Sequence, residues 1–153
     1  MASTTFSGPV TSTNGFIGNI TGNLTGNIAG TAEITHATTA AINATATATA
    51  AEVATGYITS TSAAATTITL PTGTLLGAAI GAVRGTVFDL YVDNTLGAST
   101  VTMAVATNGI LSSAAADTPG SFGDLTVAAG ATGIARFTLM FASATAYTFS
   151  RTA

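Results

Sequence analysis

The stretch Gly15-Phe-Ile-Gly-Asn-Ile-Thr-Gly-Asn-Leu-Thr-Gly-Asn-Ile-Ala-Gly30 is the most regular part of this sequence. From Ile20 onward it repeats a four-residue pattern of an apolar residue, Thr, Gly and Asn. A helix is a poor interpretation, because glycine in a helix costs about 1 kcal/mol relative to alanine, and Asn and Thr are weak helix formers. Side chains of a strand alternate between two faces, and a four-residue repeat keeps that phase. The repeat therefore predicts an extended strand.

The two faces of this strand would differ in chemistry. Odd positions carry Asn and Thr, while even positions alternate large apolar residues with glycine: Phe16, Gly18, Ile20, Gly22, Leu24, Gly26, Ile28 and Gly30. The same phase continues through Ile34 and over residues 40–48, with His36 and Thr38 as exceptions. We expect an extended arm from about residue 16 to residue 51. A helix over the alanine-rich residues 40–51 is the second choice, because alanine is the best helix former.

A strand with one apolar face needs a partner, because even a two-stranded hairpin is marginal in water. Glycines between large residues leave room for another backbone to approach. Three identical strands around a common axis would use that room, each Ile or Leu filling the space beside a neighbour's glycine. The arm therefore predicts a homotrimer. The alternative interpretation is a Gly/Asn/Thr-rich linker without regular structure.

The composition narrows the possible partners. Only 6% of the 153 residues are charged, against roughly 25% in a typical globular domain. The three cations are all arginines, and the net charge of −3 argues against binding a nucleic-acid backbone. The chain has no cysteine, which excludes disulfides and thiolate metal sites and is compatible with assembly in a reducing cytoplasm.

Neither a signal peptide nor a membrane span is expected. The first ten residues lack a basic segment followed by an apolar one. The best apolar run, residues 75–83, is interrupted by two glycines and is far shorter than the roughly 20 residues of a membrane helix.

From Val53 onward the sequence changes to short β-rich segments between turn residues. Strands are expected at residues 57–60, 66–70, 86–92, 100–105, 125–128, 133–142 and 146–151. Residues 86–92 are apolar at nearly every position and predict a central strand, which a turn at 93–97 would join to 100–105 as a hairpin. The one expected helix, residues 74–83, has an apolar face but contains Gly77 and Gly81.

These segments predict an all-β chain. Residues 1–52 would form the extended arm and an Ala/Thr-rich connector. Residues 53–153 would form an antiparallel β-sandwich, jelly-roll-like, with one short helix.

Residues capable of chemistry are few and scattered. His36 is the only histidine, and general-base catalysis would need a nucleophile and an orienting partner beside it. We expect His36 to pack or hydrogen-bond inside the oligomeric arm, although three copies around an axis could hold a metal ion. Asp93 is expected to cap a turn rather than to join Asp89 in a calcium site.

Four further charged side chains are expected to be solvated. Asp117 and Asp124 flank a predicted loop, and Arg136 and Arg151 lie on polar strand faces, where they could also pair with an acidic partner surface. No catalytic residue, cofactor or metal site is expected, and no pair of carboxylates is placed for glycoside hydrolysis. The chain is therefore not expected to be an enzyme.

Two parts of the sequence resemble virion proteins of tailed bacteriophages. The opening Phe6-Ser-Gly-Pro-Val-Thr-Ser-Thr-Asn-Gly-Phe16, followed by the Gly-Asn tetrads, is similar to the N-terminal arms of such proteins. Residues 54–71 and the stretch Arg84-Gly-Thr-Val-Phe-Asp-Leu-Tyr-Val-Asp-Asn94 resemble small head decoration (cement) proteins. The resemblance implies a homotrimer on the capsid exterior, with arms crossing capsomer boundaries, and it carries no catalytic residues.

The function expected from these observations is structural. The chain would decorate the outside of a phage capsid, assembled in the host cytoplasm, with itself and the major capsid protein as partners. The contacts are expected at Phe6, Phe16, Gly18, Ile20, Gly22, Leu24, Gly26, Ile28, Gly30 and Ile34. The alternative is a short tail or head fibre whose C-terminal β-domain binds the host surface, with Phe122 as the main aromatic candidate in its loops.

Overall fold

The computed structural model describes residue 36, residues 38–111 and residues 124–152. The chain divides into two units, Met1–Ile34 and Thr35–Ala153, and all described residues belong to the second. The described residues form ten strands and two helices: β1 (Ala40–Ala41), β2 (Ala46–Thr47), α1 (Ala50–Ala54), β3 (Tyr57–Thr59), β4 (Thr66–Thr69), α2 (Gly73–Ile80), β5 (Val87–Asp93), β6 (Val101–Ala104), β7 (Gly109–Leu111), β8 (Thr126–Val127), β9 (Ile134–Ser143) and β10 (Ala146–Arg151).

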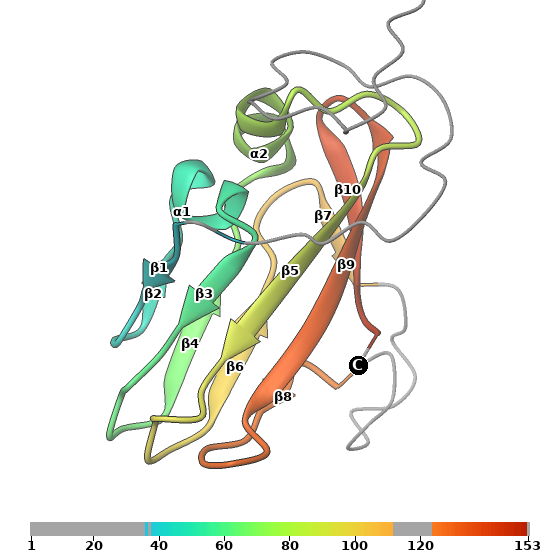
Figure 1. Cartoon of the computed structure of the whole chain (residues 1–153). Coiled ribbons are helices and arrows are strands. Elements are labelled where there is room, and N and C mark those ends of the chain that lie inside the picture. The colour runs from blue at the N-terminus through green and yellow to red at the C-terminus, as the bar shows by residue number, and fades with distance from the viewer. Residues whose placement is uncertain (1–35, 37, 112–123, 153) are drawn as a thin grey trace, which may run out of the picture. The chain divides into compact units, whose positions relative to one another are not determined.

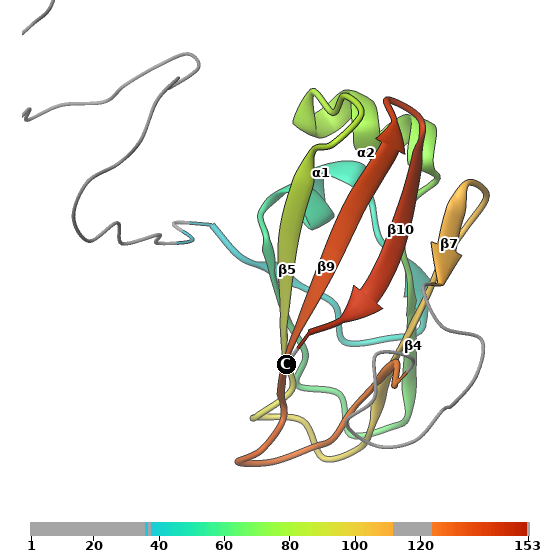
Figure 2. The ribbon, with the colours of Figure 1, turned by 90° about the vertical axis from the view of Figure 1, so that its right-hand side faces the viewer.

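The strands form two mixed sheets. The six-stranded sheet has the order β1-β3-β5-β9-β10-β7, and the four-stranded sheet has the order β2-β4-β6-β8. Figure 2 shows β5, β9 and β10 side by side, with β7 next to β10. The expectation of antiparallel pairing throughout is wrong, because five of the eight strand pairs in the described part of the chain are parallel. The coarser expectation of a β-rich fold is confirmed.

The parallel pairs arise because the chain winds from one sheet to the other and back (Figure 1). β1, β3 and β5 each lead directly into a strand of the four-stranded sheet, and α1 and α2 return the chain to the six-stranded sheet. Successive turns stack, so Ile58 lies between Ala40 and Val92 in register. The predicted hairpin of residues 86–105 is therefore wrong, since β5 and β6 belong to different sheets.

Both sheets contribute to one hydrophobic core. On β9, which confirms the strand expected at residues 133–142, Phe137, Leu139 and Phe141 are buried and the residues between them are more exposed. The Phe137 and Phe149 rings stack with centroids 4.9 Å apart. Burial of such a side chain is worth roughly 1.5–3 kcal/mol, so the strands β5, β9 and β10 supply a large part of the stability.

The segment before α1 follows the predicted phase. Ala40, Ile42 and Ala48 are buried as the even face requires, although Ala44 and Ala46 are exposed. Thr49 caps α1 through a reciprocal pair of hydrogen bonds with Glu52, the arrangement that favours a helix start. Residues 40–51 thus pack with the same core as the rest of the unit, and the predicted domain boundary at residues 52–53 falls inside α1.

Candidate binding surface

The outer face of the six-stranded sheet carries a group of aromatic and charged side chains. Leu90, Val92 and Phe137 point into the core, so their neighbours along β5 and β9 point outward. Tyr57, Tyr91 and Arg136 lie side by side on three adjacent strands, because the register pairs Tyr57 with Tyr91 and Tyr91 with Arg136. Asp89 and Asp93 flank Tyr91 on the same strand face.

Three rings form an aromatic cluster on this face, which we define as His36, Tyr57 and Tyr91. The tyrosine rings are 6.3 Å apart between centroids and nearly parallel, at 21°. The imidazole of His36 lies against both, at 5.9 Å from Tyr57 and 5.6 Å from Tyr91. The Nδ1 atom of His36 is 2.9 Å from the carbonyl oxygen of Thr55, a hydrogen-bond distance that fixes the ring.

The backbone conformation and the position of His36 both require glycine at residue 56. Its φ of +73° is a conformation that favours glycine, and a Cβ at this position would collide with the imidazole ring of His36. The expectation that His36 packs and hydrogen-bonds is confirmed within one chain; its place inside an oligomeric arm stays a prediction.

Asp93 joins the cluster to the following turn. The hydroxyl of Tyr57 donates to its Oδ2 at 3.0 Å, and the backbone N–H and hydroxyl of Thr95 donate to Oδ1 at 2.9 and 2.6 Å. Burial acts to raise the pKa of Asp93, but these donors together outweigh it and the pKa is lowered. The same burial, aided by the neighbouring carboxylate, raises the pKa of Tyr57. The predicted turn cap at Asp93 is confirmed.

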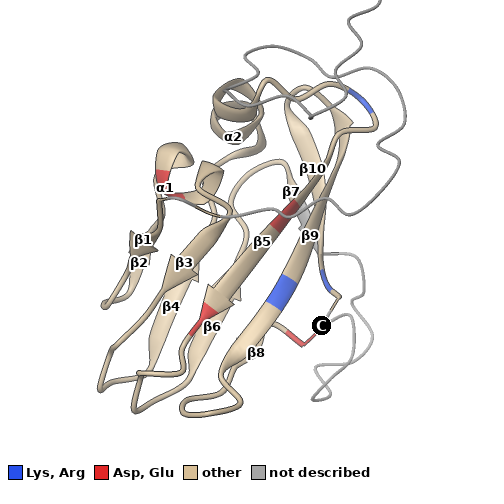
Figure 3. Ribbon diagram, viewed as in Figure 1, with Lys and Arg blue, Asp and Glu red and all other residues tan. Residues whose placement is uncertain are grey.

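Two side chains on this face have donor or acceptor atoms that make no hydrogen bond with a described residue. Arg136 donates from Nε to the hydroxyl of Thr152 at 3.1 Å, and its other guanidinium nitrogens have no hydrogen bond to a described residue. Asp89 accepts the hydroxyl of Thr138 through Oδ1 at 2.7 Å, which leaves Oδ2 without a described donor. Figure 3 shows how sparse charged residues are elsewhere on the ribbon.

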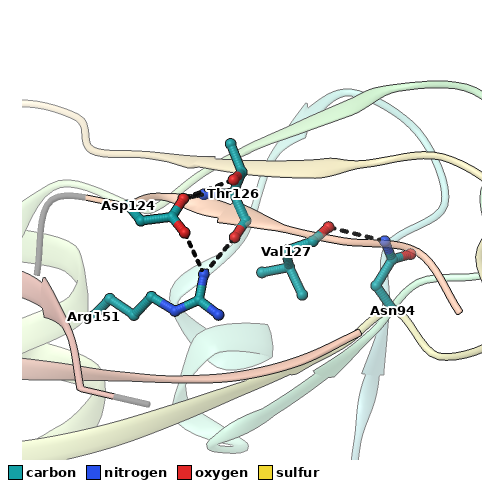
Figure 4. A network of polar contacts seen from close by, with 5 residues as sticks. All are labelled: Asn94, Asp124, Thr126, Val127 and Arg151. Carbon is teal, nitrogen blue, oxygen red and sulfur yellow. Dashed lines mark hydrogen bonds and ion pairs between the residues drawn. The ribbon is translucent and has the colours of Figure 1, made fainter. Parts of the chain in front are cut away.

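A second polar group lies between the sheets and has a structural role (Figure 4). Arg151 donates from one guanidinium nitrogen to Asp124 at 3.0 Å and to the carbonyl oxygen of Thr126 at 2.6 Å. Asp124 is only 5% exposed and also accepts the backbone N–H and hydroxyl of Thr126. The expectation that Asp124 and Arg151 are solvated is wrong, because the fold places β8 near the end of β10, which buries Asp124 and pairs it with the half-buried Arg151.

Asn94 makes the corresponding connection at the other end of β8. Its side chain is fully buried, and Nδ2 lies 2.9–3.2 Å from the carbonyl oxygens of Ser99, Val127 and Ala128. Its Oδ1 has no hydrogen-bond partner in the described part of the chain. Asn94 therefore fastens the turn after β5 to the end of β8.

The residues predicted for oligomer or capsid contact all lie outside the described residues: Phe6, Phe16, Gly18, Ile20, Gly22, Leu24, Gly26, Ile28, Gly30 and Ile34. Asp117 and Phe122 lie outside them as well. The aromatic cluster was not predicted. Its two tyrosines were placed correctly on strands, but nothing local to residue 57 or residue 91 indicates that they are partners.

Comparison of the chain with models of protein families, with curated proteins and with solved structures finds no match. Within the described residues, no helix is long and apolar enough to cross a membrane. The same residues contain no group of three His, Asp or Glu side chains that could hold a metal ion.

Proposed function

We propose that this chain is a virion structural protein, a homotrimeric decoration (cement) protein on the outside of a phage capsid. The observation that carries the proposal is the edge at β1 and β2, which has no charged residue and no proline. Each is the terminal strand of its sheet, and residues 37–51 contain no charged residue and no proline. Monomeric proteins usually protect edge strands with charge, proline or bulges, or by keeping them very short. β1 and β2 are short, at two residues each, but the edge has neither charge nor proline, which suits a protein that pairs its backbone with other chains.

The sequence before this edge supports the same proposal. The apolar–Thr–Gly–Asn repeat keeps the even-apolar phase that Ala40, Ile42 and Ala48 obey in the described part of the chain. With 6% charged residues, the chain would bind by backbone pairing and apolar burial more than by charge. Three linked arms would make the second and third contacts with the major capsid protein effectively intramolecular. The proposal gives the chain no catalytic role.

A fibre protein that binds the host surface is the second candidate. The specific observation in its favour is the aromatic cluster on the outer face of the six-stranded sheet. Aromatic side chains with polar tips are enriched where proteins meet ligands and partners.

The trimer is tested by the mass of the full chain in solution, measured by light scattering. We expect three times the mass of one chain. Gly22→Val should lower that mass, because a branched side chain would fill the space that the even face reserves for a neighbouring backbone. Thr21→Val is the matched control, since it places the same side chain on the odd face, and its mass should stay unchanged. An unchanged trimer mass in Gly22→Val would contradict the role assigned to the repeat.

A further inference from the structure

The outer face of the six-stranded sheet gathers side chains that are rare in this protein. It carries Tyr57 and Tyr91, two of three tyrosines in the chain, together with Asp89, Asp93 and one of three arginines, Arg136. The third tyrosine, Tyr147, is buried. Because only 6% of the sequence is charged, this concentration on one face is a distinctive surface feature of the described unit.

The aromatic cluster is held in place before any ligand arrives. Tyr57 is fixed by its hydrogen bond to Asp93, and Asp93 is fixed in turn by Thr95. His36 is fixed by the carbonyl of Thr55, and its ring lies against both tyrosine rings. The conformational entropy lost by these side chains when a ligand packs on the rings would therefore be small.

The charges on this face indicate what kind of ligand fits. Two carboxylates, Asp89 and Asp93, stand against one guanidinium, Arg136, so an anionic ligand such as a phosphate or a uronic acid would meet net repulsion. Among the described residues, Arg136 has guanidinium donors and Asp89 has an Oδ2 atom without a hydrogen-bond partner, and these suit a neutral ligand rich in hydroxyl groups. Tyrosine rings suit an apolar C–H face on that same ligand.

Neutral sugars combine these properties, because a pyranose ring presents C–H groups on one face and hydroxyls at its rim. We propose that the outer face of the six-stranded sheet binds a neutral oligosaccharide, with a sugar ring packed against Tyr57 and Tyr91 and hydroxyls bonded to Arg136 and Asp89. This site does not depend on the proposed decoration function, since either a capsid protein or a fibre could carry it.

The test uses the full-length protein and three neutral probes, cellohexaose, maltohexaose and chitohexaose, with hexagalacturonate as the anionic comparison. Calorimetry measures affinity, and tyrosine fluorescence reports location, because the chain has no tryptophan and two of its three tyrosines are on this face. At least one neutral probe is expected to bind with a Kd at or below about 1 mM and to change tyrosine emission. Hexagalacturonate is expected to bind more weakly.

Variants locate the site. Tyr91→Ala should weaken binding about tenfold or more, equivalent to about 1.4 kcal/mol, whereas Tyr91→Phe keeps the ring and should change affinity little. Arg136→Ala should also weaken binding and leaves the aromatic rings in place. Thr148→Ala, a small change on neighbouring β10, is the control and should bind like the parent protein.

Three results would overturn the proposal: no binding of any neutral probe up to about 10 mM, a range that covers weak millimolar sites; binding heat without a change in tyrosine emission; or equal affinity in Tyr91→Ala and the parent. If no sugar binds and the face becomes buried when copies of the chain assemble, the face is a protein interface instead.

Discussion

Asn94 shows how much a single buried side chain can hold together. Replacing it with alanine removes one donor group from three carbonyl oxygens, those of Ser99, Val127 and Ala128. The contact with Val127 is buried and the other two are partly buried, so losing their donor is costly, and we expect Asn94→Ala to lower the free energy of unfolding by about 2–4 kcal/mol.

Asn43→Ala is the matched control for this prediction. The side chain of Asn43 is exposed and accepts one hydrogen bond, from the N–H of Thr61 at 2.7 Å. Its loss should cost no more than about 1 kcal/mol. Urea unfolding of both variants measures the difference, and equal losses would contradict the role given to Asn94.

Tyr147 predicts how stability depends on pH in the alkaline range. Burial raises the pKa of Tyr147 to about 12, from the ordinary value of 10.0. Its hydroxyl donates to the carbonyl oxygen of Pro71 at 3.0 Å in the core. Between pH 10 and 12 the unfolded chain loses this proton and the folded chain keeps it. Stability is therefore fully present below pH 10 and falls as pH rises through this window, by on the order of 2–3 kcal/mol.

Thermal unfolding at several pH values checks this expectation. The Tyr147→Phe variant should be somewhat less stable at pH 7, because it lacks the hydrogen bond to Pro71, and should lose less stability between pH 10 and 12. If parent and variant lose stability equally over that window, Tyr147 is not the group responsible.

At the residue scale, sequence reasoning succeeded where the interaction is local. The turn cap at Asp93 involves Thr95, two residues away, and such pairs follow from turn chemistry. The ion pair of Arg151 with Asp124 spans 27 residues, and its partners were expected in solvent. Only the docking of β8 near the end of β10 brings them together, and nothing in either local sequence encodes that docking.

Helix α2 is the element in which packing and helix propensity disagree most clearly. Gly77 lies in the middle of the helix, where alanine would be favoured by about 1 kcal/mol. A Cβ at Gly77 would collide with the carbonyl oxygen of Ala144 in the turn between β9 and β10. Gly81, in contrast, ends the helix with a φ of +64° and has open space around it.

We therefore expect Gly77→Ala to destabilise the protein, by about 1–3 kcal/mol, because the turn must move to admit the methyl group. Whether Gly77→Ala lowers or raises the free energy of unfolding shows which of the two effects is larger. Chemical denaturation showing a gain in stability would mean that intrinsic propensity outweighs contact with the Ala144 turn. Ala78→Gly, on the exposed side of α2, should lose about 1 kcal/mol from propensity alone and calibrates the comparison.

Most elements could be predicted, because hydrophobic alternation and turn residues are local signals. All seven strands expected after residue 53 are present with small changes of bounds, and the helix expected at 74–83 forms as Gly73–Ile80. β1 and β2 were assigned to the arm, and β7, beside the undescribed residues 112–123, was not expected. Of the two glycines in the predicted helix, Gly77 makes room for the turn at Ala144 and Gly81 ends the helix.

At the scale of the whole molecule, strand pairing could not be predicted. Parallel partners such as Ala40 and Ile58, or Ile68 and Met103, are joined through a crossing between sheets. A short sequence with turn residues favours hairpins, and that expectation produced the wrong antiparallel arrangement. Parallel strands require a crossover connection, which is usually a helix. The sequence indicated only one such connection, the helix that is α2 in the structure.

The proposed function requires copies of the chain to assemble with one another and with a capsid. The uncharged edge at β1 and β2 and the low overall charge would let copies approach each other and a capsid without strong repulsion. A decoration protein must also be present at many equivalent positions on the shell. That requirement separates it from a fibre, which is present at a few.

The most direct measurement is the copy number of this chain in purified particles of the phage proposed to encode it, determined by quantitative mass spectrometry against the major capsid protein. The account predicts a copy number in simple ratio to the capsid subunit, so that the protein is among the most abundant in the particle. A handful of copies would contradict the decoration function and favour a fibre, and absence from the particle would contradict both.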